Sequence, residues 1–116
     1  MVKLTKTKGG KKVGTKLKIE EVKPFEIARR LKNGEKLNII DVREGNEVET
    51  GKIPGAKHIP LGEILTRLDE LDKEKEYVMV CRSGNRSGLA SEWLTDKGFK
   101  VKNMVGGMSN WESDIE

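Results

Sequence analysis

One cysteine stands among residues that suit an anion-binding loop. Cys81 is the only cysteine in the 116-residue chain and follows the apolar run 77–80. The loop residues that are candidates for substrate binding are Arg82, Ser83, Gly84, Asn85, Arg86 and Ser87. Backbone N–H groups and cations around a thiol lower its pKa from about 8.5 to roughly 3.5–7.5, and the thiolate is the reactive form. The segment therefore predicts a nucleophilic Cys81 held in a positively charged pocket.

A structural role for Cys81 is the main alternative to this interpretation. A free cysteine at the end of an apolar strand is usually a small core residue. Two arginines, two serines and a glycine directly after the strand are poor core material, and they favour the reactive interpretation. Gly84 fits a tight loop in which φ is positive or a side chain would fill the pocket.

The single cysteine and the single histidine exclude several other kinds of chemistry. One cysteine cannot form an intrachain disulfide or a C-x-x-C metal site, and one histidine, His58, excludes His–Cys zinc sites and helical histidine pairs. Apolar runs stay well short of the roughly 18–20 residues of a membrane span, and no signal-peptide pattern is visible. We expect a cytoplasmic protein with a reduced thiol, a surface or hydrogen-bonded His58, no metal and no membrane contact.

Strand and helix patterns alternate from residue 19 onward. The expected strands lie at 19–22, 37–42, 57–59, 77–81 and 99–104. The expected helices begin at Pro24 with the apolar stripe Phe25, Ile27, Ala28 and Leu31, cover 61–71 as one amphipathic α-helix, begin again near Asn85, and end the chain at 108–111. A turn or short helix is expected at 44–50 and a loop at 51–56. Trp93 and Trp111 are expected as core anchors.

This alternation predicts an α/β fold with a parallel sheet and helices on both faces. A continuous apolar run such as 77–81 is typical of a strand covered on both sides. Ligands of such folds bind beyond the carboxyl ends of the strands. Cys81 lies at one of these ends, so the predicted nucleophile lies where the fold class predicts a ligand.

The positive charge is concentrated at the N-terminus. Residues 1–18 contain seven of the 23 basic residues and no acid, which leaves 16 basic against 19 acidic residues in 19–116, a net charge of −3. We expect residues 1–18 to be a flexible basic tail and 19–116 to be the folded domain. An electrostatic contact of the tail with RNA or an acidic partner is one interpretation. A solubilising segment is favoured, because no aromatic residue is interleaved for base stacking.

Four motifs in this order resemble the single-domain rhodaneses, the thiosulfate sulfurtransferase family. They are Cys81–Ser87 for the active-site loop, Asp41–Glu44 for the D-V-R-E segment, Gly51–Pro60 for the G-H-I-P-G-A-x-x-I-P segment, and Val105–Trp111 for the closing L-x-G-G-x-x-x-W segment. Lys52 stands where histidine is common in the family. The resemblance covers about residues 20–114, and residues 1–18 lie outside it.

The resemblance implies a central parallel sheet of about five strands and a ping-pong sulfur transfer. Cys81 would take the sulfane sulfur of a small anionic donor such as thiosulfate, become a persulfide, and pass the sulfur to cyanide or to a thiol or protein acceptor. No cofactor would be needed, and a monomer is expected. Arg86 is the candidate that binds the donor's anionic end and steadies the loop, while Arg82 would attract anions.

Asp41 and Arg43 allow two interpretations. They could be a pair behind the site that orients the active loop, since Asp41 ends a strand at the same sheet edge. A buried ion pair that holds the following turn is favoured.

Three other functions remain open on sequence grounds. They are a thiol-based phosphatase or arsenate reductase, a non-catalytic interaction module of the same fold, and a persulfide carrier that serves one partner.

Overall fold

The computed structural model describes residues 18–116. The predicted flexible tail lies almost entirely outside these residues. None of the helices in 18–116 is long and apolar enough to cross a membrane.

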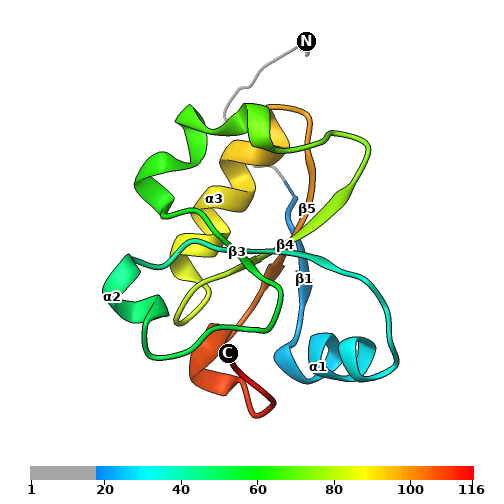
Figure 1. Ribbon diagram of the computed structural model, residues 1–116. Helices are drawn as coiled ribbons and strands as arrows, with labels where there is room; N and C mark the ends of the chain where they lie inside the picture. The colour runs from blue at the N-terminus through cyan, green and yellow to red at the C-terminus, as the bar shows by residue number, and fades with distance from the viewer. Residues whose placement is uncertain (1–17) are drawn as a thin grey trace, which may run out of the picture.

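Five parallel strands form one central sheet (Figure 1). They are β1 (Glu20–Val22), β2 (Asn38–Asp41), β3 (Lys57–His58), β4 (Glu76–Val80) and β5 (Lys100–Met104). Their order in the sheet is β1-β5-β4-β2-β3, and every pair is parallel. The α/β prediction with about five parallel strands is confirmed, and all five carboxyl ends meet at one edge.

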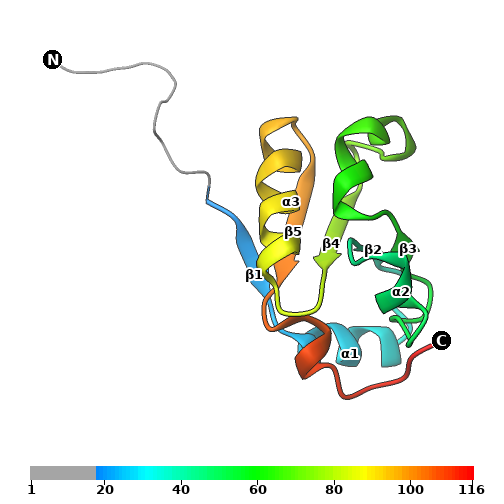
Figure 2. The ribbon, with the colours of Figure 1, turned by 90° about the vertical axis from the view of Figure 1, so that its left-hand side faces the viewer.

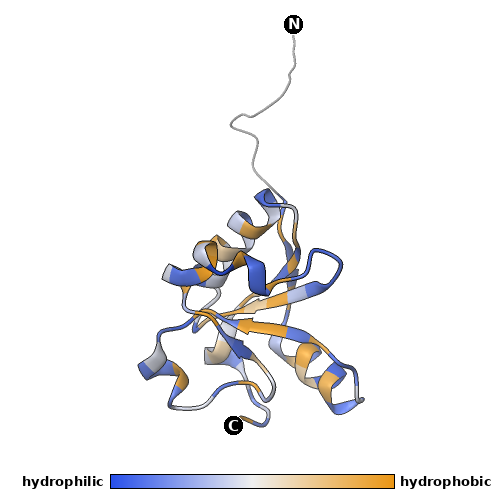
Figure 3. Ribbon diagram, turned by 45° about the horizontal axis from the view of Figure 1, so that its top comes forward, coloured by the Kyte–Doolittle hydropathy of each residue, from blue (hydrophilic) through white to orange (hydrophobic). Residues whose placement is uncertain are grey.

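Helical segments cover both faces of the sheet (Figure 2). They are α1 (Pro24–Lys32), α2 (Gly45–Val48), α3 (Asn85–Asp96) and the 3-10 helices η2 (Leu61–Thr66), η3 (Leu68–Glu70) and η4 (Gly107–Asn110). Apolar residues of β2, β4 and β5 pack with α3, η2 and η3 on one face. A second apolar cluster joins α1 and η4 to the other face. The apolar colouring follows the central strands in Figure 3, as expected for strands buried on both sides.

Alternating side chains divide the sheet core between these two faces. Ile40 and Met79 belong to the cluster under α3, while Ile39 and Val78 belong to the cluster under α1. Trp93 and Trp111 are partly buried and pack against the first and the second cluster, respectively. Both tryptophans therefore anchor helical segments to the core, as predicted.

The prediction of a single α-helix over 61–71 is wrong. The segment forms two 3-10 helices, η2 and η3, separated at Arg67, whose φ is −123° and ψ 26°. A 3-10 helix places residues i and i+3 on one face, so Leu61 and Ile64 reach the core together while Leu65 is 45% exposed. The same apolar spacing suits both kinds of helix over so short a length.

The apolar stripe predicted for the first helix is also partly wrong. Ile27 is fully buried, but Phe25 is 69% exposed in the first turn of α1. Pro24 is the first helical residue, as predicted. The other expected elements appear within one or two residues of their predicted bounds, and the short final helix is the 3-10 helix η4.

Candidate active site

The sulfur of Cys81 lies inside a ring of hydrogen-bond donors. β4 ends at Val80, and α3 begins at Asn85, so the loop between them turns around the sulfur. The backbone N–H groups of Gly84 and Ser87 lie 3.1 and 3.3 Å from Sγ, and the Ser87 hydroxyl lies 3.3 Å away. Amides directed inward at a helix N-terminus favour negative charge. The ring is therefore suited to a thiolate.

Gly84 allows the loop to turn this tightly. Its φ is +99°, in the left-handed region that favours glycine. A Cβ at Gly84 would also lie 3.2 Å from the backbone nitrogen of Gly106. Conformation and packing both require glycine here, in agreement with the sequence prediction.

The pKa of Cys81 is lowered from its ordinary value by opposing effects. Burial raises the pKa of the thiol, but hydrogen bonds from the loop, among them those of the Ser87, Gly84 and Ser83 backbone N–H groups, lower it by more. The negative charge of a thiolate also acts on Arg86, whose own pKa is raised first by its hydrogen bond to Glu47. The net effect is a more acidic thiol than a free cysteine.

Cys81 has no exposed surface. Its sulfur is surrounded by the loop that leads from β4 to α3.

Arg86 is paired with a carboxylate that sequence reasoning did not single out. Its two terminal nitrogens donate to the Glu47 carboxylate at 2.7 and 2.8 Å, a bidentate arrangement. This pairing lowers the pKa of Glu47 from 4.5 to about 2. Glu47 also accepts from the Glu44 backbone N–H in a capping box at the start of α2. The guanidinium predicted to bind the donor's anionic end is thus engaged with α2.

Arg82 has a more open position in the loop. Arg82, Ser83 and Asn85 are exposed. A depression of about 530 Å³ at the loop is lined by Arg43, Asn46, Glu47, Thr50, Arg82, Met108 and Ser109. Arg82 is therefore the loop arginine whose side chain lines this depression.

Asp41 and Arg43 form a buried ion pair behind α2. Arg43 donates to both Asp41 carboxylate oxygens at 2.8–3.1 Å, and the two side chains are 6% and 1% exposed. Arg43 also donates to the backbone carbonyls of Glu47 and Gly51 at 3.4 and 2.8 Å. The pair thus holds the turn that follows β2, which is the favoured interpretation. The Arg43 contact with the Glu47 backbone also supports the residue whose carboxylate pairs with Arg86.

The turn at Gly106–Gly107 places η4 against the active loop. Met108 and Ser109 donate backbone N–H groups to the carbonyl oxygens of Cys81 and Arg82, both at 2.9 Å. Gly107 has φ +58°, and a Cβ there would collide with those two oxygens. These contacts fix the outward-facing carbonyls of the loop.

Asn103 on β5 is the second contributor that sequence reasoning missed. It is 7% exposed and contacts both ends of the loop, at Gly84 and at Ser87. Its place in a strand gave no sequence signal, because a polar residue in a strand is usually solvent-facing. His58, at the end of β3, lies 2.7 Å from the Arg43 carbonyl oxygen through Nε2, which agrees with its predicted structural role.

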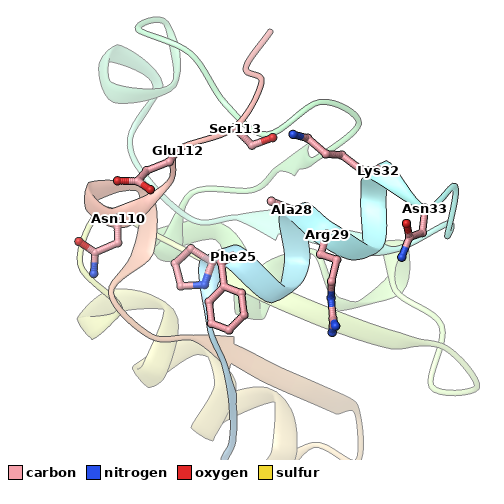
Figure 4. A pocket seen from close by; sticks show the side chains of 9 residues that line it. Phe25, Ala28, Arg29, Lys32, Asn33, Asn110, Glu112 and Ser113 are labelled. Carbon is pink, nitrogen blue, oxygen red and sulfur yellow. The ribbon is translucent and has the colours of Figure 1, made fainter.

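A second depression, of about 420 Å³, lies between α1 and the segment after η4 (Figure 4). Its lining includes the exposed Phe25, Asn110 and Glu112 and none of the residues of the active loop. Residues 18–116 contain no group of three or more His, Cys, Asp or Glu side chains that could hold a metal ion.

The chain is similar in sequence to a family of known proteins. The Rhodanese-like domain model matches residues 24–114. The "Putative sulfurtransferase YtwF" of Bacillus subtilis is 43% identical over 100 residues, which cover 86% of this chain and 97% of that protein. A sulfurtransferase of Allochromatium vinosum is 33% identical over 94 residues, which cover 80% of this chain and 88% of that protein.

A solved structure gives the same result for the fold. The crystal structure of a rhodanese-like domain protein from Staphylococcus aureus superposes with a TM-score of 0.80 at 32% identity, covering 84% of this chain and 97% of that one.

Proposed function

The chain belongs to the rhodanese-like domain family, and from this premise we propose that it is a sulfurtransferase that moves a sulfane sulfur from thiosulfate or a similar anionic donor to a thiophilic acceptor. The observation that carries the proposal is the pair of backbone N–H donors, from Gly84 and Ser87, directed at Cys81 Sγ at the carboxyl end of β4. Cys81 is the only thiol in the chain, so it is the one residue that can hold the sulfur as a persulfide.

The reaction proceeds in two balanced steps. The Cys81 thiolate attacks the outer sulfur of thiosulfate, an S–S bond forms, and the donor's own S–S bond breaks with its electron pair leaving on sulfite. The persulfide then passes its terminal sulfur to cyanide or to an acceptor thiolate, which regenerates the Cys81 thiolate. Sulfite is a weak base and leaves without a proton, so no general acid is required.

The loop groups have separate roles in this proposal. The amides of Gly84 and Ser87 stabilise negative charge on the sulfur. Arg82 attracts the donor from the depression at the loop mouth. Arg86 steadies the loop through Glu47 and contributes its charge to the field at the sulfur.

A phosphatase reaction fits these groups less well. Four residues separate Cys81 from Arg86, a short loop for the five heavy atoms of a phosphoryl group. Misplacement by about 1 Å costs on the order of a hundredfold in rate. The carboxyl nearest the loop arginine, Glu47, has a pKa of about 2 and cannot supply the proton that an alkoxide leaving group needs near neutral pH.

Intact mass after mixing with thiosulfate tests the proposal. We expect the protein to gain the mass of one sulfur atom, to lose it on addition of cyanide, and to show neither change in Cys81→Ser. A Cys81→Ser variant that still turns over thiosulfate would contradict the role of Cys81. Efficient hydrolysis of an aryl phosphate, lost in Cys81→Ser, would favour the phosphatase instead, and a folded protein inert in both assays would favour an interaction module.

A further inference from the structure

The Ser87 hydroxyl lies between two groups that could both accept its proton. Its Oγ is 3.3 Å from Cys81 Sγ and 2.6 Å from Asn103 Oδ1. A serine hydroxyl carries one hydrogen, so it donates to one of the two at a time. Ser87 and Cys81 have no exposed surface and Asn103 is 7% exposed. The direction in which the hydroxyl hydrogen points therefore decides whether Ser87 acts on the sulfur as a hydrogen-bond donor or as an acceptor.

The loop backbone fixes the orientation of the Asn103 amide. Its Nδ2 lies 3.1 Å from the carbonyl oxygen of Gly84. A backbone carbonyl only accepts, so the amide NH2 must face Gly84, and Oδ1 must face Ser87. Since Oδ1 also only accepts, the short contact requires the Ser87 hydroxyl to donate to Asn103. The Ser87 oxygen then faces the sulfur with its lone pairs.

The surroundings of Asn103 keep the amide in this orientation. Asn103 is paired with Met79 in the β4–β5 ladder. On the α3 side, the amide packs closely against Gly88. A Cβ at Gly88 would lie only 3.2 Å from Asn103 Nδ2. Turning the amide over would leave the buried Gly84 carbonyl facing Oδ1, two acceptors in contact.

We propose that Asn103 is a positioning residue that holds the Ser87 proton away from Cys81, so that the hydroxyl meets the sulfur as an acceptor and not as a donor. A protonated Cys81 then donates its S–H to Ser87 Oγ, which donates onward to Asn103. The thiolate is stabilised by the amides of Gly84 and Ser87 without the hydroxyl. A thiolate that is less stabilised is more basic and therefore more nucleophilic.

The charged groups around the sulfur stay the same in the test. They are Arg82 and Arg86 from the loop and α3, Glu47 from α2, and the Asp41–Arg43 pair at the end of β2. None of them is altered by substitutions at Ser87 or Asn103. A comparison of these substitutions therefore reports on the hydrogen bond.

The test is the pH dependence of iodoacetamide labelling of Cys81 in four full-length proteins. They are the unmodified chain, Ser87→Ala, Asn103→Leu and the double variant. With Asn103 present, Ser87→Ala should leave the midpoint of labelling unchanged or move it to lower pH. In the Asn103→Leu background the hydroxyl is free to donate to the sulfur, so the same Ser87→Ala change should move the midpoint to higher pH.

Asn103→Leu alone should show two opposite changes in labelling rate. Below the midpoint the larger thiolate fraction outweighs the lower nucleophilicity, and labelling should be about threefold faster. Above the midpoint all of the sulfur is thiolate, and labelling should be about threefold slower. A packing role alone does not predict rate curves that cross.

Two results would overturn the proposal. One is a midpoint that rises in Ser87→Ala with Asn103 in place, which would make the hydroxyl a donor to the sulfur. The other is an equal effect of Asn103→Leu with and without Ser87. Ser87→Ala removes one oxygen atom only, so its sign decides even if Asn103→Leu does not fold.

The link to catalysis rests on the proposed function and is measured separately. Sulfur gain from thiosulfate at high pH should be slower in Asn103→Leu than in the unmodified chain. If the labelling midpoints shift as predicted but the protein takes no sulfur from thiosulfate, the role of Asn103 is supported and the proposed function is contradicted. Sulfur gain at high pH that is as fast in Asn103→Leu as in the unmodified chain would overturn the catalytic part of the Asn103 proposal.

Discussion

The two arginines of the active loop differ in what surrounds them. Arg86 makes a bidentate pair with Glu47 and lies partly buried, whereas Arg82 is exposed beside the depression at the loop mouth. Partial burial and two parallel hydrogen bonds make the Arg86–Glu47 pair more than a surface ion pair. We therefore expect the binding of a free anion to depend mainly on Arg82, whereas the sequence favoured Arg86 for this role.

Arg82→Ala is expected to raise the KM for thiosulfate about fivefold at low salt, because one charge at about 4 Å contributes roughly 1 kcal/mol in water. Its labelling midpoint should change little. Arg86→Ala should instead move the labelling midpoint to higher pH, since the sulfur loses a nearby positive charge. Initial-rate kinetics with thiosulfate measures the change in KM, and iodoacetamide labelling against pH measures the change in midpoint. A larger KM effect in Arg86→Ala than in Arg82→Ala would contradict the assignment.

The Arg86–Glu47 pair should also appear in the acid stability of the protein. The pKa of Glu47 is lowered to about 2 from 4.5, so the folded state holds this carboxyl ionised more strongly than the unfolded chain does. Its stabilisation is complete above pH 4.5 and is lost as the pH falls towards 2. Glu47→Gln should therefore lower Tm at neutral pH, and the difference from the unmodified chain should shrink between these two values.

Glu70→Gln is the matched control for this measurement. Glu70 also has a pKa lowered to about 2, first by its hydrogen bond to Arg67, but it lies at the surface. Solvent screens such a pair, so Glu70→Gln should change Tm less and lose its effect at high salt. Equal pH profiles for the two variants would show that Glu47 contributes no more than an exposed carboxylate.

Sequence reasoning found the residues of the active loop but not their partners outside it. Cys81, Gly84 and Ser87 lie within one short segment of the chain, and the thiol, the glycine and the hydroxyl each indicate a role in an anion-binding loop. Glu47 and Asn103 lie 39 and 16 residues from the loop side chains that they contact. Such pairings depend on how α2 and β5 pack, which composition and periodicity do not report.

At the scale of elements, η4 holds the active loop from outside. Its first N–H groups satisfy the carbonyl oxygens of Cys81 and Arg82, and Gly107 lets the two backbones approach. The loop is thus fixed by α2 through Arg86, by β5 through Asn103 and by η4 through its carbonyls. Each of these elements begins or ends at the same edge of the sheet.

Gly107→Ala is expected to destabilise the fold and slow sulfur transfer together. A left-handed φ in a non-glycine residue costs about 1–3 kcal/mol, and here the Cβ would also collide with the loop carbonyls. Gly55→Ala is the control, because Gly55 has φ +82° and nothing within 4 Å of an added Cβ. Gly55→Ala should lower Tm by the conformational cost alone and leave transfer unchanged. Similar transfer rates in the two variants would contradict a role for η4 in holding the loop.

Element types were predicted correctly for the five strands and for the helices that begin at Pro24 and Asn85. The run at β4 and the helix after Asn85 were predicted because each has one period over its length. The segment 61–71 was predicted as one α-helix, because spacings of three and four residues suit an α-helix as well as two 3-10 turns. Phe25 is exposed because it lies in the first turn of α1, beside the depression shared with Asn110.

At the scale of the whole molecule, the parallel sheet explains why distant segments share one site. The strand order β1-β5-β4-β2-β3 places β5 and β2 on the two sides of β4. Asn103 and Asp41 therefore flank Cys81 although they lie far apart in the chain. The alternation of strands and helices predicted a parallel sheet, but the order of the strands depends on long-range pairing that no local pattern contains.

Charge is distributed unevenly along the chain, and this should set how fast an anionic donor arrives. Removal of residues 1–18 takes seven lysines and changes the net charge from +4 to −3. Thiosulfate carries two negative charges, so its association should slow, and most strongly at low salt, where the screening length rises from about 10 Å at 0.1 M to about 30 Å at 0.01 M. The sheet and the site use residues from Glu20 onward, so kcat and Tm should stay near their original values.

A full-length variant with the seven lysines changed to glutamine separates charge from chain length. It should match the truncated protein, with kcat/KM for thiosulfate below that of the unmodified chain at low salt and equal to it at high salt. The reason is that attraction at a distance acts on the rate of encounter and disappears when salt screens it, while the chemistry at Cys81 depends on groups within a few ångströms. A truncated protein that melts several degrees lower, beside a glutamine variant that does not, would show instead that the N-terminal segment packs on the domain. Salt profiles that coincide for all three proteins would exclude any contribution of the segment to donor capture.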